Sequence, residues 1–137
     1  MPPVTRWFLK SGLLCLLAAL AGLALLPARA ALGLPAEVLA LWPTLLHLLV
    51  VGWITQLIFG VAYWMFPRHT AEAPRGSERL AWAAWGSLNL GMVLRLVAEP
   101  RAALGHDAGL LLVLAALLHL AAAACFITNT WPRVKAR

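Results

Sequence analysis

The chain has 137 residues, of which 63% are hydrophobic and only 12% are charged. This composition excludes an ordinary water-soluble globular domain and indicates a membrane protein. The net charge of +6 does not indicate nucleic-acid binding, because the basic residues lie at the edges of apolar runs rather than in one soluble patch.

Four runs without acidic or basic residues predict membrane-spanning helices. They cover residues 11–28, 38–67, 80–94 and 108–132. Each run supplies roughly 20 apolar residues once its flanks are trimmed or, for the third run, once it is extended past Arg95. We therefore predict an all-α, up-down-up-down, four-helix transmembrane bundle in a single domain, with helices at about residues 7–28, 37–66, 78–98 and 107–131.

The first run also fits a signal peptide, because a basic segment and an apolar stretch precede an Ala28-Arg29-Ala30 pattern. We expect instead a retained helix that Pro27 stops. Ser77 and Asp107 are placed to cap the third and fourth helices.

Basic residues flank the runs asymmetrically. One side carries Arg6, Lys10, Arg68, Arg75, Arg79, Arg133, Lys135 and Arg137, and the other carries Arg29 and Arg101, with Arg95 near a helix end. The positive-inside rule then predicts that both termini face the cytoplasm. We expect an integral protein of a bacterial-type inner membrane.

Two histidines within the apolar runs are the main functional signal. His47 lies nine residues after Val38, and His119 lies eleven residues after Ala108. In the predicted bundle these two helices run in the same direction, so both imidazoles are expected about 14 to 16 Å below the outer helix ends. Polar residues in hydrocarbon are costly and usually functional. We therefore predict that His47 and His119 bind one metal centre between them.

Small residues surround His119 on its helix. Ala115, Ala116, Ala122 and Ala123 occupy the positions three and four residues away. They predict a flat space that fits a porphyrin, although close packing of helices also favours alanine.

Around His47 the helical stripe contains Val51 and Thr55 and is free of acids. With no carboxylate expected nearby, imidazole ligands favour iron or copper, and bis-histidine ligation favours haem b. Trp53 lies deep enough to pack on the ring. The alternative is that each histidine only bridges helices by a hydrogen bond.

Arg95 is the candidate partner of the haem propionates, because it lies near the outer end of the third helix. Its alternatives are an ion pair with Glu99, four residues later, or snorkelling to the interface.

Other residues are weaker candidates. Met92 could replace one axial histidine, while His69 and His106 fall in predicted loops, where solvation is the simplest interpretation. Gln56, Ser87 and Asn89 are expected to hydrogen-bond between helices, with a purely structural packing role as the alternative. Cys15 and Cys125 show no metal-binding spacing and are expected to be small buried residues.

The pattern His47-x5-Trp53-x6-Gly60-x2-Tyr63-Trp64-x2-Pro67 resembles the haem-ligand helix of haem-copper oxidase catalytic subunits, in the branch of the cbb3-type oxidases and nitric oxide reductases. The stretches NLGMVLRL and FITNTWPR are similar to later parts of that superfamily and to short NnrS-type membrane proteins. The resemblance implies that His47 is a low-spin haem ligand. It covers the second to fourth helices loosely.

The chain also departs from that family, whose catalytic subunits need about twelve spans and a three-histidine copper cluster. A complete oxidase is therefore not expected, and no catalytic residue is assigned. We predict a small b-type haem protein for electron transfer or haem-linked sensing, exchanging electrons with a quinol or an outer-face carrier. Analogy with the family's threefold arrangement suggests a homotrimer. The alternatives are a cofactor-free accessory or assembly subunit of a respiratory complex and a copper-handling membrane protein.

Overall fold

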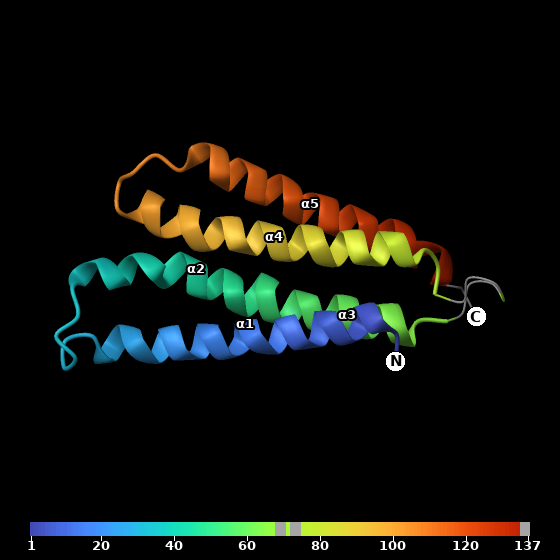
Figure 1. Ribbon diagram of the computed structural model, residues 1–137, viewed down its shortest axis with the longest axis horizontal. Helices are drawn as coiled ribbons and strands as arrows, with labels where there is room; N and C mark the ends of the chain where they lie inside the picture. Colours follow the sequence, from blue (N-terminus) through green and yellow to red (C-terminus); the bar gives the residue numbers. More distant parts are fainter. Residues whose placement is uncertain (68–70, 72–74, 135–137) are drawn as a thin grey trace.

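The computed structural model describes residues 1–67, 71 and 75–134, and in this part of the chain the secondary structure is entirely helical. Four helical spans are long and apolar enough to cross a membrane. They run alternately up and down along one long axis, and the first span begins at the end of the bundle where the fourth span finishes (Figure 1). The predicted four-helix bundle and its helix order are therefore confirmed, and the composition of the spans indicates an integral membrane protein.

The first span is α1 (Pro3–Ala28). It begins four residues before the predicted start, and Pro27 lies inside its last turn rather than ending it. Proline lacks one amide donor but does not prevent the preceding residues from closing the turn. Val4, Phe8 and Ala19 of α1 are buried against the other helices, so α1 is an integral part of the packed bundle.

The second span (Ala36–Met65) is helical throughout but not uniform. It consists of a 3₁₀ segment η1 (Ala36–Leu41), helix α2 (Trp42–His47), a π-helical segment η2 (Leu48–Thr55) and helix α3 (Gln56–Met65). The sequence predicted a plain helix here. The π segment begins directly after His47. Segments of this kind are rare and are frequently found at functional sites.

The third and fourth spans form an antiparallel pair (Figure 1). Helix α4 (Glu78–Ala103) starts with the predicted cap, since Ser77 Oγ accepts a hydrogen bond from the Leu80 amide at 3.3 Å. It continues through Pro100 and ends five residues after the predicted end. Helix α5 (Gly109–Thr130) is followed by the 3₁₀ turn η3 (Trp131–Arg133). Asp107 Oδ1 accepts from the Gly109 amide at 3.1 Å, one residue outside the cap position of α5.

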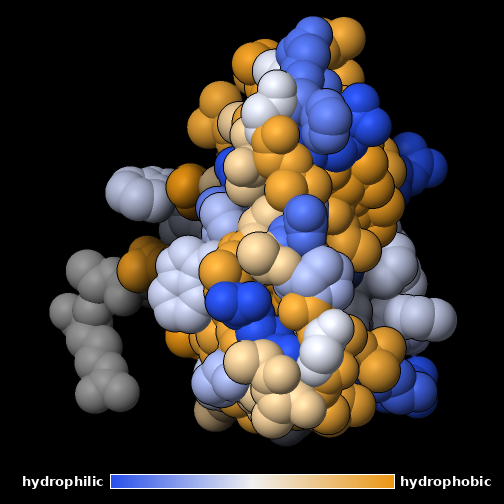
Figure 2. Space-filling model, turned by 90° about the vertical axis from the view of Figure 1, so that its left-hand side faces the viewer, coloured by the Kyte–Doolittle hydropathy of each residue, from blue (hydrophilic) through white to orange (hydrophobic). Residues whose placement is uncertain are grey.

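Hydrophobic packing forms two layers along the bundle. One cluster includes Leu45, Leu48 and Met92, and the other includes Phe8, Tyr63 and Ala84. The outward faces of the spans carry large exposed apolar side chains, as expected of surfaces that face lipid. The end of the bundle opposite the termini mixes hydrophilic and hydrophobic residues (Figure 2).

A polar cluster joins three spans in the interior. Gln56 is fully buried and lies 2.5 Å from Ser11 Oγ of α1, while its amide nitrogen donates to Asn89 Oδ1 of α4 at 3.3 Å and to the Gly52 carbonyl at 2.8 Å. Trp85 Nε1 donates to Ser11 Oγ at 3.2 Å. This confirms the expected hydrogen bonding of Gln56 and Asn89 between helices.

The end of the bundle that carries the termini, here called the terminal end, is held by two buried side chains. Arg133 is fully buried and donates to the carbonyls of Phe66 at 2.8 Å and Pro67 at 3.0 Å, just after α3. Asn129 accepts from the Ser77 amide at 2.7 Å and donates to the Ser77 carbonyl at 3.0 Å. The Asn129 side chain lies against Gly76, whose φ of +75° suits glycine.

Candidate functional site

Helix α4 brings the two predicted histidines into one region of the bundle, because each of them contacts this helix. His47 comes from the last residue of α2, and His119 comes from the middle of α5. His47 meets α4 at Glu99, and His119 meets it at Gly91.

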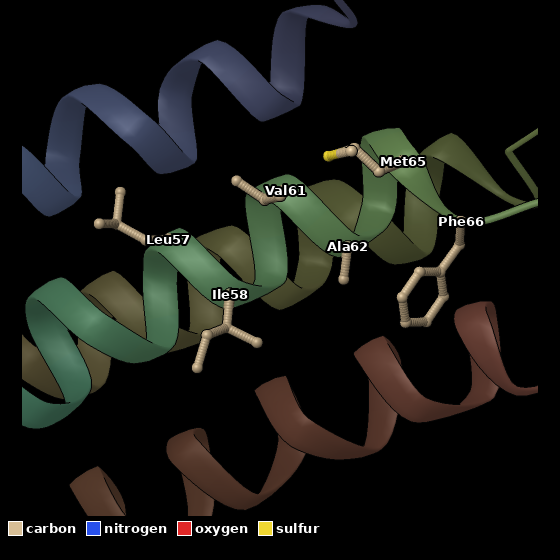
Figure 3. A pocket seen from close by; sticks show the side chains of 6 residues that line it. All are labelled: Leu57, Ile58, Val61, Ala62, Met65 and Phe66. Atoms are coloured by element: carbon tan, nitrogen blue, oxygen red, sulfur yellow. The ribbon is translucent and has the colours of Figure 1, made fainter.

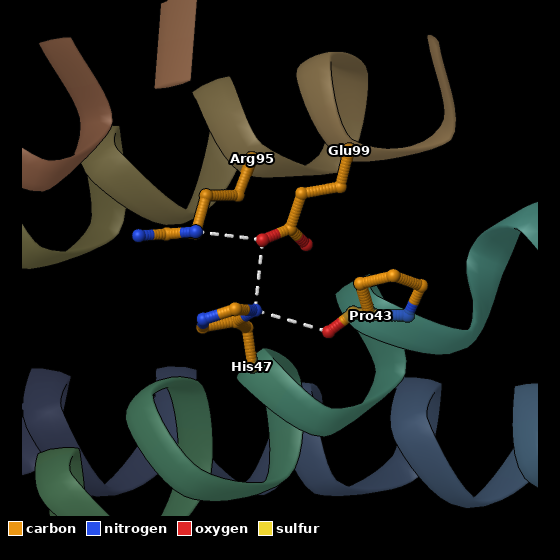
Figure 4. Close-up of polar contacts among 4 residues, drawn as sticks. All are labelled: Pro43, His47, Arg95 and Glu99. Atoms are coloured by element: carbon orange, nitrogen blue, oxygen red, sulfur yellow. Dashed lines mark hydrogen bonds and ion pairs between the residues drawn. The ribbon is translucent and has the colours of Figure 1, made fainter. Parts of the chain in front are cut away.

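His47 is held by two oxygen acceptors on one side of its ring. Its Nδ1 lies 2.8 Å from Glu99 Oε1 and 3.0 Å from the Pro43 carbonyl oxygen, one turn earlier in α2 (Figure 4). The Pro43 carbonyl can only accept a hydrogen bond, so Nδ1 carries a hydrogen and donates it. Among the described residues Nε2 has no hydrogen-bond partner. Metal-bound histidines usually donate their second ring N–H to a carboxylate or a carbonyl, and the contacts of His47 Nδ1 are compatible with that arrangement.

The acidic neighbour of His47 corrects one expectation. The stripe around His47 within the second span is free of acids, and no carboxylate was expected near the ring. The fold places Glu99 of α4 there, with its side chain only 6% exposed. In the sequence Glu99 stands directly beside an apolar run and four residues after Arg95, a spacing that indicates only a partner for Arg95.

Arg95 forms the ion pair predicted as its alternative role. Its Nη1 lies 2.7 Å from Glu99 Oε1, the same oxygen that meets His47. The three side chains therefore form a chain His47, Glu99, Arg95 across α2 and α4 (Figure 4). Several polar atoms of this region are buried without a partner among the described residues: Arg95 Nε, Glu99 Oε2 and Thr44 Oγ1.

His119 packs directly on the backbone of α4. A Cβ atom built at Gly91 would lie 2.6 Å from His119 Nε2, so the ring fills space that only glycine leaves free. His119 Nε2 is buried and has no hydrogen-bond partner among the described residues, although the Leu88 carbonyl is close to the ring. An unpartnered ring nitrogen in an apolar interior is costly unless another group satisfies it.

The two histidines contact α4 at different levels. Glu99 and Gly91 are eight residues apart, which corresponds to about 12 Å of helix rise. Equal distances of His47 and His119 from the starts of their spans do not give the two rings a common depth, because the spans need not begin at the same height. The long Glu99 side chain shortens the separation, since side chains on a helix lean toward its N-terminus.

The four alanines around His119 do not share one surface. Ala115 and Ala122 are completely or almost completely buried, and the Ala115 carbonyl lies 3.2 Å from the Cβ built at Gly91. Ala116 is exposed and Ala123 is half-buried. Close packing of α5 on α4, the alternative explanation for alanine, therefore accounts for Ala115 and Ala122.

The remaining candidate residues occupy varied positions. Val51 is half-buried beside the cluster that contains Leu48, and Trp53 has a buried Nε1 without a partner among the described residues. Met92 is buried in the same cluster, and His106 is exposed. His69 lies outside the described residues. Cys15 and Cys125 are free and half-buried rather than fully buried.

Two further observations limit the kind of site. Within the described residues no group of three or more His, Cys, Asp or Glu side chains is placed to hold a metal ion. A depression of about 480 Å³ lies on α3, but its lining is apolar and includes Ile58, Ala62 and Phe66 (Figure 3). This depression has no chemically reactive group and faces lipid in a membrane.

Comparison with known proteins gives no independent assignment. No protein-family model, no curated protein and no solved structure matches the chain. The resemblance to haem-copper oxidases therefore stays a prediction from residues of the second to fourth spans.

Proposed function

We propose that the protein is a small integral-membrane b-type haem protein in which His47 and His119 are the axial ligands. The observation that carries this proposal is the state of the two rings. Each lies inside a membrane span against α4, and each keeps an Nε2 atom without a protein partner in the described part of the chain. The donor set suits haem iron, which accepts two imidazoles and needs no carboxylate ligand.

The other residues would act around the two ligands. Arg95 keeps donors beyond the one that Glu99 engages and lies where it can pair with a propionate. Ala116, Ala123, Val51 and Trp53 are the side chains left to border the ring, since Ala115 and Ala122 pack α5 against α4. Bound haem supplies one-electron chemistry, and with both axial positions filled this favours electron transfer or haem-linked sensing over catalysis.

The setting of this function follows from the sequence. We place the termini in the cytoplasm of a bacterial-type cell, with the histidines in the outer half of the membrane, because basic residues gather at the terminal end. A quinol or an outer-face electron carrier would then exchange electrons with the haem. A homotrimer is the proposed assembly, by analogy with the family that the second span resembles.

Absorption spectroscopy of the purified protein tests the proposal. The wild type should show a Soret band and the spectrum of six-coordinate low-spin haem, with about one iron per chain. His47→Ala and His119→Ala should each lose or alter this spectrum. His106→Ala is the matched control, because His106 is exposed outside the spans, and it should leave the spectrum unchanged. A folded, colourless wild type would overturn the proposal, and copper without iron would favour copper handling.

A cofactor-free accessory subunit is the second candidate, and one observation favours it. The ion pair between His47 and Glu99 joins α2 to α4 without any metal, as a bridging histidine would. In that case the wild type is colourless, and His47→Ala lowers the stability of the bundle without changing any spectrum.

A further inference from the structure

The first two turns of α1 carry a basic hollow at the terminal end of the bundle. It has a volume of about 220 Å³ and is lined by Pro3, Arg6, Trp7 and Lys10. We propose that this hollow binds the headgroup of an anionic phospholipid, whose acyl chains lie along the apolar face of the same helix. The site involves neither predicted histidine, so it is independent of the proposed function.

Two cations line the hollow, and the protein does not neutralise them. Arg6 and Lys10 are exposed, and neither forms an ion pair with an acidic side chain in the described part of the chain. They are four residues apart, so they lie on one face of α1 about 6 Å apart along its axis. Like charges at this spacing repel each other. A phosphate group between them would relieve this repulsion and accept charge-assisted hydrogen bonds from both side chains.

Trp7 indicates the depth of the hollow in a membrane. Its side chain is exposed, and its ring meets the ring of Trp85 on α4 edge-on, with 5.5 Å between the centroids. Trp85 meets Trp82 in the same way at 5.7 Å. Tryptophans that gather near the ends of membrane spans lie at the level of the lipid headgroups. The hollow is therefore expected at the level of the lipid phosphates.

The face of α1 that carries the hollow continues as an apolar surface. Leu13, Leu14 and Leu17 follow Lys10 by three, four and seven residues, and all three are exposed. The acyl chains of a lipid held at the hollow would lie on these leucines. A soluble phosphate ion would use the cations but not the apolar surface below them. Cations and leucines on one face therefore favour a lipid as the occupant.

Binding of two lipids to the purified protein, titrated by native mass spectrometry, tests the site. The wild type should bind the anionic lipid phosphatidylglycerol more tightly than phosphatidylcholine, which has no net charge. Arg6→Gln and Lys10→Gln should each lower the affinity for phosphatidylglycerol by about tenfold, because each removes a hydrogen bond between charged groups. Their affinity for phosphatidylcholine should stay unchanged.

Arg79→Gln is the matched control for these variants. Arg79 is exposed in the first turn of α4, and it does not line the hollow. This variant should bind phosphatidylglycerol as the wild type does. Each single variant leaves the other basic residues of the terminal end in place, so the topology signal persists and the protein should insert normally.

Fluorescence quenching locates the bound lipid. In phosphatidylcholine vesicles, a phosphatidylglycerol that carries a nitroxide close to its headgroup should quench the wild type more than Trp7→Phe. The combined variant Arg6→Gln and Lys10→Gln should lose this difference. Equal affinity of the wild type for the two lipids would overturn the proposal, and so would an equal loss of affinity in Arg79→Gln. Displacement of the lipid by inorganic phosphate would also overturn it, because the occupant would then be a soluble anion.

Discussion

At the scale of single residues, Gly91 shows how closely His119 is fitted to α4. The His119 ring occupies the space in which any other residue at position 91 would place its Cβ atom. Packing of this kind needs a residue without a side chain on one helix and a flat ring on the other. Neither residue indicates the contact by itself, because glycine is common in membrane helices for several reasons.

The substitution Gly91→Ala tests this contact. The added methyl group would lie 2.6 Å from His119 Nε2 and Cδ2, so the ring has to move. We expect the free energy of unfolding to fall by about 1 to 3 kcal/mol, as for other overpacked sites. Unfolding in mild detergent, followed by circular dichroism, measures the change.

Gly86→Ala is the control for this experiment, because a Cβ atom at Gly86 meets nothing within 4 Å. That variant should be unchanged or slightly more stable, since alanine favours the helix. Equal stability of the two variants would contradict the contact between Gly91 and His119.

At the scale of elements, the π segment of the second span is tied to the polar cluster around Gln56. The π segment η2 ends where Gln56 begins α3, and Gln56 donates to the Gly52 carbonyl inside that segment. The same side chain reaches α1 and α4 through Ser11 and Asn89. A hydrogen bond in hydrocarbon has no water to compete with it, so the cluster fixes the relative positions of three spans.

Removal of this cluster should loosen the bundle. Gln56→Leu keeps a buried side chain but leaves Ser11, Asn89 and the Gly52 carbonyl without their partner. We therefore expect the free energy of unfolding to fall by about 1 to 3 kcal/mol. Thr55→Val is the matched control, since the Thr55 hydroxyl donates only to Val50 of its own segment. If Gln56→Leu and Thr55→Val unfold at the same temperature in detergent, the polar cluster contributes little to the stability of the bundle.

At the scale of the whole molecule, the terminal end depends on contacts between segments that are far apart in the chain. Arg133, just after α5, donates to the carbonyls of Phe66 and Pro67, which directly follow the second span. The rings of Phe59 and Phe126 stack at 3.9 Å and also join α3 to α5. These contacts hold the antiparallel pair of α4 and α5 against the rest of the bundle. The sequence indicated Arg133 only as a topology signal.

Arg133→Lys should weaken this end although it keeps the positive charge. Lysine cannot place several donors in the planar arrangement that reaches the Phe66 and Pro67 carbonyls, and we expect a loss of about 2 kcal/mol. Limited proteolysis should then cut more quickly near residues 66–77. Arg101→Lys, at an exposed position on α4, should have no effect and serves as the control. Equal cleavage rates would argue against this role of Arg133.

The sequence by itself determined the helical class, the number and order of the spans, and the two histidines as the residues to examine. These features follow from local composition, because about 20 apolar residues are needed to cross a bilayer and a polar residue within them is conspicuous. Only the tertiary structure decided that Glu99 lies against His47, that His119 packs on Gly91, and that Ala115 and Ala122 serve helix packing. Such contacts join residues from different spans, and their formation depends on the rotation and height of each helix. Hydrophobicity and spacing along one helix determine neither its rotation nor its height in the bundle, because nearly every face of these helices is apolar.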